Sequence, residues 1–350
     1  LGMARLHLGR SAEAHADFRA ALRLRDAFPE AWVALAEALE ALGRYADALA
    51  ALETAIAQRE HYVGALINAS ALLRKIGRLP EAEAKLREIP DDDPEYPNAL
   101  AMRAAMLYSQ GRADEAERNF RRAIEVKPDF HQAHNDLGNV LRSLGRSQGA
   151  EASYRRAIEL DSRYREAHNN LGNVLRDLGR LSEAQASYRR ALELEPDYPE
   201  AHSNLANALH DLGRIAEAEA GYRRTLEIAP DYANAHDNLA LLLGAQGRAV
   251  EALEVAMRSL AIRETAEAKG IFVDCIRHLR PADADARIRT IVARALTEPW
   301  GRPSELARIA TDLARLNPDT QACMARAARA SPAKLRSDAL FGPTGLIALA

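Results

Sequence analysis

Apolar residues recur along the chain at the spacing of helices that each bury one stripe. Between residues 165 and 178 the apolar positions fall at i, i+3, i+4 and i+7, which is one face of an α-helix: Leu171, Val174, Leu175 and Leu178. A second segment, about 182–194, places four residues on one face: Ala184, Tyr188, Ala191 and Leu192. Gly179 separates the two segments and Pro196 follows the second, as residues that end helices do. The pattern predicts a pair of helices.

This helix pair repeats every 34 residues. A Gly-Arg dipeptide recurs eight times at that interval without a slip, beginning at residues 9, 43, 77, 111, 145, 179, 213 and 247. Four residues after each arginine comes an alanine, at positions 14, 48, 82, 116, 150, 184, 218 and 252. We expect this alanine to let the two helix backbones approach closely, and the Tyr or Phe four residues later to fill the space beside it. Because neither helix can bury its stripe alone, neighbouring pairs must stack into one continuous core.

The repeat resembles that of the tetratricopeptide family, whose repeats are 34 residues long. The residues that carry the resemblance are Trp32, Leu35, Ala48 and Ala55 in one repeat and Leu171, Gly172, Leu175, Ala184, Tyr188, Ala191 and Pro196 in another. It implies an all-α fold, a right-handed superhelical solenoid of antiparallel helix pairs followed by a helical tail. The resemblance covers residues 1–263, as one partial and seven full repeats.

Two repeats depart from the pattern. Arg103 stands where other repeats have leucine, and a Pro-Asp-Asp-Asp-Pro segment, residues 90–94, shortens the second helix of the repeat before it. We expect a kink or looser packing there.

The 34-residue register fades after Arg263. We expect a capping helix within residues 264–280, over about 266–279, because a terminal repeat must cover an open apolar face. Residues 281–350 read as a helical tail, or as a linker to a missing C-terminal domain, with helices at about 284–297, 304–316 and 318–330 and turns at 299–303 and 341–345. Segments 268–273 and 298–303 resemble those that follow such arrays in bacterial tetratricopeptide–methyltransferase fusions. Trp300 is expected to be a packing anchor, and the alternative is that it marks a domain interface.

Composition narrows the function classes. The formal charge is −3, with 47 basic and 50 acidic residues, so no global field draws the chain to nucleic acid or to an anionic membrane. The two cysteines, Cys275 and Cys323, exclude a disulfide framework and read as core thiols of a cytoplasmic protein. No phosphate-binding glycine loop, metal-ligand motif or nucleophile elbow occurs, so we expect neither a catalytic site nor a cofactor within these residues.

Family geometry implies that the first helix of each repeat lines a concave groove through its fifth, sixth, ninth and twelfth positions. In the C-terminal half these positions form an asparagine-rich track, which we take as the candidate peptide-binding site: Asn135, Asp136, Asn139, Asn169, Asn170, Asn173, Asn204, Asn207 and Asn238. A carboxamide can donate to a peptide C=O and accept from a peptide N–H, so a row of them can hold an extended backbone. The track resembles the asparagine ladder of O-linked N-acetylglucosamine transferase and SPINDLY-type proteins. The alternative is that duplication of near-identical repeats copied the asparagines without a function.

The N-terminal half of the groove is apolar, lined by Val33, Ala34, Ile67, Met102, Ala105 and Tyr108. It can hold an apolar peptide or a partner helix, or it can face a missing upstream repeat or a second copy in a homodimer. The carboxylate clamp of the chaperone-binding branch of the family is excluded, because its lysines are absent.

Two further columns have structural explanations. A histidine column, formed by His134, His168, His202 and His236, lies on helices about 10 Å apart, too far for one metal whose bonds are about 2 Å. We expect half-buried packing and hydrogen-bonding groups. Arginine pairs at 121–122, 155–156, 189–190 and 223–224 each have a glutamate three or four residues on, which is the spacing of ion pairs within a helix.

Three functions follow in order of preference. The first is a protein–protein interaction scaffold that binds extended peptide segments. The second is the substrate-selecting N-terminal arm of a larger bacterial glycosyltransferase or methyltransferase, whose catalytic domain would lie beyond Ala350. A nucleic-acid-binding solenoid ranks last, because basic and acidic residues are balanced.

Overall fold

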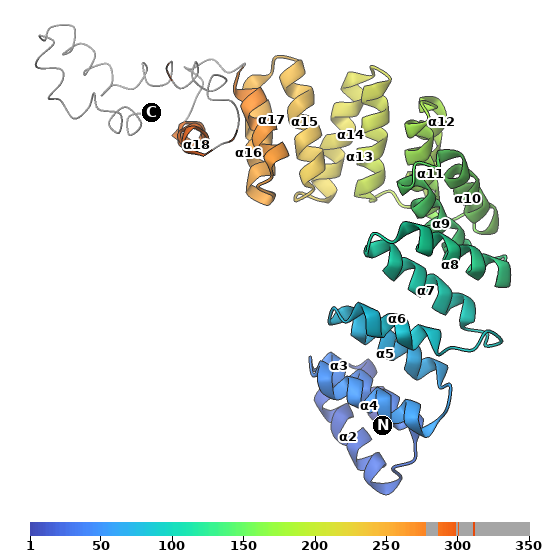
Figure 1. Ribbon diagram of the computed structural model, residues 1–350. Helices are drawn as coiled ribbons and strands as arrows, with labels where there is room; N and C mark the ends of the chain where they lie inside the picture. The colour runs from blue at the N-terminus through green and yellow to red at the C-terminus, as the bar shows by residue number, and fades with distance from the viewer. Residues whose placement is uncertain (278–285, 299, 301–310, 312–350) are drawn as a thin grey trace, which may run out of the picture. The chain divides into compact units, whose positions relative to one another are not determined.

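The computed structural model describes residues 1–277, 286–298, 300 and 311. Over these residues it contains eighteen helices and no strand, so the predicted all-α fold of antiparallel helix pairs is confirmed there (Figure 1). The chain divides into two parts, residues 1–178 and 179–350, and each is described by itself.

The first part contains eleven helices: α1 (Gly2–His7), α2 (Ser11–Leu24), α3 (Pro29–Ala41), α4 (Tyr45–Gln58), α5 (Val63–Lys75), α6 (Leu79–Arg87), α7 (Tyr96–Ser109), α8 (Ala113–Val126), α9 (His131–Ser143), α10 (Ser147–Leu160) and α11 (Arg165–Asp177). The described residues of the second part form α12 (Leu181–Leu194), α13 (Pro199–Asp211), α14 (Ile215–Ile228), α15 (Ala233–Ala245), α16 (Ala249–Ile262), α17 (Ala266–Ile276) and α18 (Ala286–Thr297). From α3 to α16, odd-numbered helices are the first of their repeats and even-numbered helices the second.

The Gly-Arg dipeptide ends the first helix of each repeat. All eight glycines have φ between 72° and 80°, the left-handed region that only glycine enters without strain. In the repeat of α9, Gly145 N–H donates to the Arg142 carbonyl at 3.0 Å and Arg146 N–H donates to the Leu141 carbonyl at 2.8 Å. This pair of bonds satisfies carbonyls that the helix end would otherwise leave open. The second helix then begins directly after the arginine.

The alanine of each repeat lies where its two helices cross. All eight of these alanines have no solvent-exposed surface. Five of them belong to two apolar clusters, one from Ala14 to Met106 in the first part and another from Ala206 to Trp300 in the second. Each cluster includes residues of several successive repeats, so the predicted sharing of one core between neighbouring repeats is present there.

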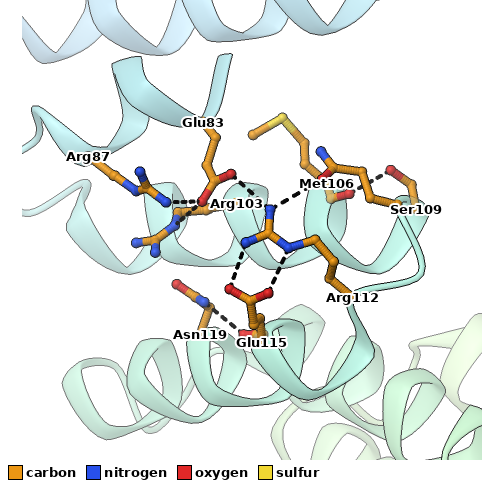
Figure 2. Close-up of polar contacts among 9 residues, drawn as sticks. Glu83, Arg87, Arg103, Met106, Ser109, Arg112, Glu115 and Asn119 are labelled. Carbon is orange, nitrogen blue, oxygen red and sulfur yellow. Dashed lines mark hydrogen bonds and ion pairs between the residues drawn. The ribbon is translucent and has the colours of Figure 1, made fainter. Parts of the chain in front are cut away.

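The arginine of the Gly-Arg dipeptide has a second role that the sequence analysis missed. Arg112 pairs through Nε and Nη2 with Glu115 at 2.7 Å on α8, and its Nη1 donates to Glu83 at 3.3 Å on α6 (Figure 2). It therefore ties its own second helix to the second helix of the preceding repeat. The same bond, spanning 29 residues, recurs in three other places within the two parts: Arg146 to Glu117 at 2.5 Å, Arg214 to Gln185 at 3.2 Å and Arg248 to Glu219 at 2.8 Å. We call this contact the inter-repeat clamp.

The two predicted departures from the repeat pattern have different effects on the structure: one shortens a helix, and the other replaces an apolar contact by ion pairs. Helix α6 has nine residues where other second helices have fourteen, which confirms the shortening by the proline-flanked segment. Helix α7 runs uninterrupted through Arg103, so the arginine does not break it. The Nε of Arg103 donates to Glu83 at 3.2 Å, and the buried Glu83 carboxylate also pairs with Arg87 at 2.5 Å (Figure 2). An ion-pair cluster thus stands where other repeats have an apolar contact.

The last described helices continue the core of the second part. Helix α17 packs against α15 and α16, and it ends at Ile276 rather than at the expected residue 279. Burial raises the pKa of the Cys275 thiol to about 12, in agreement with a core cysteine. Trp300 is buried against Phe272, with ring centroids 5.9 Å apart, so the predicted anchor is confirmed. The helices expected at 304–316 and 318–330, the turn at 341–345, residues 299 and 301–303 of the first turn, and Cys323 lie outside the described residues.

In one repeat the acceptor of the inter-repeat clamp is a glutamine instead of a glutamate, and this difference predicts the effect of a substitution on stability. Gln185 replaces the glutamate found at 83, 117, 151 and 219, and its buried Nε2 has no hydrogen-bond partner. A Gln185→Glu change would remove this orphaned donor and supply a carboxylate for Arg214 and for Arg189 one turn later. We expect thermal denaturation to show a gain of about 1 kcal/mol in the free energy of unfolding.

The reverse change, Glu219→Gln, is the matched control, because it should lower the free energy of unfolding by removing the charged partner of Arg248. A fall in stability on Gln185→Glu would show that the clamp does not stabilise the stack.

Candidate functional site

The predicted site residues all lie on first helices, as their spacing requires. In the first part, α9 carries Asn135, Asp136 and Asn139, and α11 carries Asn169, Asn170 and Asn173; in the second, α13 carries Asn204 and Asn207 and α15 carries Asn238. The sixth- and ninth-position side chains are half-buried, whereas the fifth-position side chains of Asn135 and Asn169 are only 4% and 5% exposed. The fifth position therefore faces the packed interior between helices rather than open solvent.

Carboxamides of neighbouring repeats bond to one another. Asn170 Nδ2 donates to Asn135 Oδ1 at 3.0 Å in the first part, and Asn238 Nδ2 donates to Asn207 Oδ1 at 2.9 Å in the second. A buried or half-buried carboxamide must find such partners. These bonds fix the rotamers of the asparagines and tie successive first helices together, which is a positioning role that the sequence analysis did not foresee.

A tyrosine on the second helix supports the ninth-position asparagine. Tyr154 Oη donates to Asn139 Oδ1 at 2.8 Å, and Tyr222 Oη donates to Asn207 Oδ1 at 2.7 Å. The sequence carried the signal for this bond, because the tyrosine always follows the asparagine by 15 residues. In the repeat that has Phe120 instead, the ninth position is Ala105. The hydroxyl and the carboxamide are therefore present or absent together.

The ring of Tyr154 needs a glycine on the first helix. A Cβ added at Gly138 would lie 2.5 Å from Tyr154 Cε1, closer than non-bonded carbons approach. Two repeats later the arrangement is reversed: the first helix has Ala206, and the second helix has Gly221, whose added Cβ would lie 2.8 Å from Ala206 Cβ. One of the two facing positions stays free of a side chain, so the crossing distance that seats the tyrosine is kept.

Asp136 is the one acid at the sixth position of the track. Asn135 Nδ2 donates to its Oδ1 at 3.1 Å, and the Asn139 carboxamide also hydrogen-bonds the carboxylate. Burial raises the pKa of Asp136, because the charged form loses water, and the two carboxamides act in the opposite direction. Both of these hydrogen bonds come from neutral donors.

Two cavities in the first part lie at the groove positions that the resemblance implies. One, of about 220 Å³, lies between α5 and α7 and is lined by Ser70, Arg74, Met102, Ala105, Met106 and Ser109. The other, of about 430 Å³, lies among α7, α9 and α11 and is lined by Tyr108, Asn139, Arg142, Ser143 and Asp177. The predicted apolar residues Met102 and Ala105 therefore meet in one cavity, and Tyr108 joins Asn139 in the other. Val33 and Ala34 line a separate apolar hollow of about 700 Å³ beside α1 and α2.

The histidine column is structural. His134, His168, His202 and His236 each place Nε2 between 2.8 and 3.1 Å from a carbonyl oxygen six residues earlier. Trp32 makes the same bond from its indole N–H to the Asp26 carbonyl at 3.0 Å, three repeats before His134. These side chains lock the loop that enters each first helix, which confirms the predicted hydrogen-bonding role. Among the described residues no group of three or more His, Cys, Asp and Glu could hold a metal ion.

The arginine pairs form ion pairs within their helices, as predicted. The second arginine of each pair contacts the glutamate three residues later, at 2.7 to 3.1 Å: Arg122 to Glu125, Arg156 to Glu159, Arg190 to Glu193 and Arg224 to Glu227. In three of the pairs the first arginine pairs instead with the glutamate four residues before it, at 2.5 to 2.9 Å: Arg121 with Glu117, Arg155 with Glu151 and Arg223 with Glu219. The residue four before Arg189 is Gln185. Within the described part of the chain, no helix is both long enough and apolar enough to span a membrane.

The stacked helix pairs define the chain as a helical-repeat protein. Four tetratricopeptide repeat models match it: one at residues 1–62 and 101–165, and others at 39–106, 172–213 and 197–265. The chain belongs to the tetratricopeptide repeat family. No curated protein matches it.

Several solved structures are similar to the chain. The C-terminal part of a TPR repeat-containing protein from Cytophaga hutchinsonii aligns over 68% of this chain and 98% of its own, with a TM-score of 0.53 and 16% identity. MamA is similar over 46% of this chain and 94% of its own, with a TM-score of 0.42 and 22% identity. YrrB, described as a TPR protein with an unusual peptide-binding site, is similar over 53% of this chain and 95% of its own, with a TM-score of 0.43 and 23% identity.

The glycine that seats Tyr154 yields a prediction with a matched control. We expect Gly138→Ala to lower the free energy of unfolding by about 1–3 kcal/mol, because the new methyl group overlaps the tyrosine ring. Gly270→Ala on α17 adds the same atom where nothing lies within 4 Å, and it should raise stability by up to about 1 kcal/mol through helix propensity. Chemical denaturation of both variants measures the two effects, and equal effects would contradict the assigned contact.

Proposed function

We propose that the chain is a protein-interaction scaffold that binds extended peptide segments along the groove of its first helices. The observation that carries the proposal is that sixth, ninth and twelfth positions line two cavities in the first part, and that one of these positions is Asn139, whose carboxamide is oriented by Tyr154. On the same track, Asn170 is held by its bond to Asn135. The cavity between α5 and α7, which has an apolar wall and a few polar groups, is of the kind that is typical of ligand sites.

The carboxamides keep bonding capacity for a peptide. Asn170 uses one N–H to bond Asn135, which leaves its other N–H and its oxygen, and Asn238 is in the same condition against Asn207. A donor and an acceptor on one side chain match the C=O and N–H of a peptide unit. Because each side chain is held in place before binding, little rotamer entropy is lost when the peptide arrives.

The spacing also suits an extended chain. First helices of adjacent repeats lie about 10 Å apart, and an extended peptide rises about 3.3 Å per residue. One asparagine therefore meets about every third residue of the ligand. Each bond contributes about 1 kcal/mol net, so the track alone gives weak binding with little sequence preference. The cavities then have to supply the rest of the affinity.

The two functions predicted from the sequence share this groove. The resemblance of the track to the asparagine ladder of O-linked N-acetylglucosamine transferase supports the second function, an arm that presents substrates to a transferase. The first function, a scaffold, requires only that the groove binds peptides. Cytoplasmic location, a homodimer through a terminal repeat and the absence of nucleic-acid binding remain predictions from the sequence. Both functions require peptide binding at the same residues, so one experiment tests that common requirement.

The test is the binding of fluorescent peptides of varied sequence to the 350-residue chain and to its Asn170→Ala/Asn238→Ala variant. We expect the wild type to bind many sequences weakly and the variant to lose about 2 kcal/mol, or about 30-fold in Kd, because two backbone contacts are removed.

Asn119→Ala is the control, since Asn119 lies on the second helix α8 and bonds only the Glu115 carbonyl there. It should bind as the wild type does. Thermal denaturation of each variant checks that the stack is intact. Equal binding by the wild type and the double variant would mean that the asparagines are a remnant of duplication.

A further inference from the structure

One repeat lacks the acid of the inter-repeat clamp. The residue 29 positions before Arg44 is His15, whereas a glutamate or glutamine stands at this distance before five other Gly-Arg arginines, at 83, 117, 151, 185 and 219. Arg44 still holds Asp47 of its own repeat, through Nε at 2.8 Å and Nη2 at 2.6 Å. Its Nη1, the atom that Arg112 uses for the clamp, has no acceptor among the residues that the structure describes. The clamp is therefore incomplete in this repeat.

The second cation that holds the clamp acid is also kept. Glu117 is bonded by Arg146 at 2.5 Å and by Arg121, four residues later on the same helix, at 2.7 Å. Arg19 stands four residues after His15 on α2, in the place of Arg121, and it forms no ion pair with a described residue. Two guanidinium groups are thus placed for a carboxylate that this repeat does not supply.

The next repeat lacks the acid as well, but it has changed in a compensated way. Leu49 stands 29 residues before Arg78, and the position four residues after the leucine is Glu53 rather than an arginine. The leucine is buried, and the carboxylates of Glu81 and Glu53 both raise the pKa of Arg78. In that repeat an apolar side chain fills the place and acids surround the arginine. The repeat of His15 instead has both arginines and no acid between them.

A cavity lies at the position of the missing carboxylate. It has a volume of about 180 Å³, and its charged or titratable lining groups are His15, Arg19, Arg44 and Asp47. Trp32 and mainly apolar side chains of α3 and α4 form the other walls. With a neutral histidine, two guanidinium groups against one carboxylate give the lining a net positive charge. The apolar walls strengthen the attraction of an anion, because they lower the local dielectric constant.

His15 offers a further donor in this cavity. Burial, Arg44 and Arg19 lower the pKa of the imidazole, whereas Asp47 acts in the opposite direction. The ring is therefore neutral at pH 7 and keeps one N–H. Its Nε2 is buried and has no hydrogen-bond partner. Buried polar atoms without a partner are rare in folded proteins, and an oxygen of a ligand would supply the partner here.

We propose that this cavity binds the carboxylate of an acidic side chain from a partner peptide, in the place that a glutamate of the chain itself takes in other repeats. The carboxylate accepts from Arg19, from Nη1 of Arg44 and from Nε2 of His15, and such charge-assisted bonds are the strong ones. The site lies on α2, α3 and α4 and shares no residue with the asparagine track. It therefore goes beyond the proposed function and does not depend on it.

The experiment follows the fluorescence of Trp32, which lines the cavity, during titrations at constant ionic strength against chloride. The probes are acetate, an acetylated and amidated pentapeptide with one glutamate among alanines, the same peptide with glutamine, and inorganic phosphate. Trp300, the other tryptophan, is buried in the second part and is unchanged in every variant. We expect acetate and the glutamate peptide to give a saturable change, and the glutamine peptide to give none.

The deciding variants are His15→Glu and His15→Gln. The first supplies the chain's own carboxylate to Arg19 and Arg44, as Glu117 does to its two arginines, so it should abolish the response without lowering the midpoint of thermal denaturation. The second has the same shape as the first without its charge, keeps a donor, and should keep the response.

A second pair of variants tests the unpaired arginine. Arg19→Gln should weaken acetate binding about tenfold, because it removes one charge-assisted hydrogen bond. Arg23→Gln removes the same charge one turn further along α2, where the side chain is exposed and outside the cavity, and it should bind as the wild type does. Thermal denaturation checks that both variants are folded.

The outcomes separate the site from its ligand. No response of the wild type to either carboxylate, an undiminished response in His15→Glu, or equal weakening by Arg19→Gln and Arg23→Gln would overturn the site. Saturation by phosphate alone would overturn the carboxylate as its ligand, and binding of acetate but not of the glutamate peptide would overturn the peptide side chain as its source. Loss of peptide binding in the asparagine variants leaves this site unaffected, so the two proposals can fail separately.

Discussion

The close crossing of two helices at a single small residue is the contact on which every repeat depends. An alanine without exposed surface lies at each crossing, and a larger residue there would separate the helices and open the core. The facing position obeys the same constraint, with Gly138 below Tyr154 in one repeat and Gly221 against Ala206 in another. Because each crossing is local, stability accumulates repeat by repeat, and polar contacts between neighbouring repeats add to the apolar contacts that they share.

The polar contacts between repeats form two sets, one on the second helices and one on the first helices. On the second helices, the Gly-Arg arginine bridges to an acid 29 residues earlier, and where the apolar pattern fails at Arg103 the buried Glu83 gathers three arginines. On the first helices, carboxamides bond from repeat to repeat. In the first set, one guanidinium nitrogen bonds the side chain of the preceding repeat, while Nε and Nη2 of the same arginine hold a glutamate of its own repeat, as Arg112 does with Glu83 and Glu115. The second set is neutral and half-buried, and therefore keeps capacity for a ligand.

Support of the track by tyrosines links packing to binding. The same close crossing that seats Tyr154 brings its hydroxyl to Asn139, and Asn139 in turn contacts both Asp136 and the adjoining cavity. A ligand group in this cavity would meet side chains whose rotamers are already set. Preorganisation of this kind favours affinity, because the cost of ordering the site has been met in folding.

Much of the fold could be predicted from the sequence, because the 34-residue period, the left-handed glycines and the alanines at the helix crossings are all local signals that repeat. The residues of the track were placed on the correct helices for the same reason. The spacing did not reveal that Asn135 and Asn169 turn into the packed interior, or that Arg112 reaches Glu83, since both depend on how one repeat is rotated against the next. Side-chain pairing between repeats is set by that rotation. Only the tertiary structure therefore decided which polar groups are used in the stack and which remain beside a cavity.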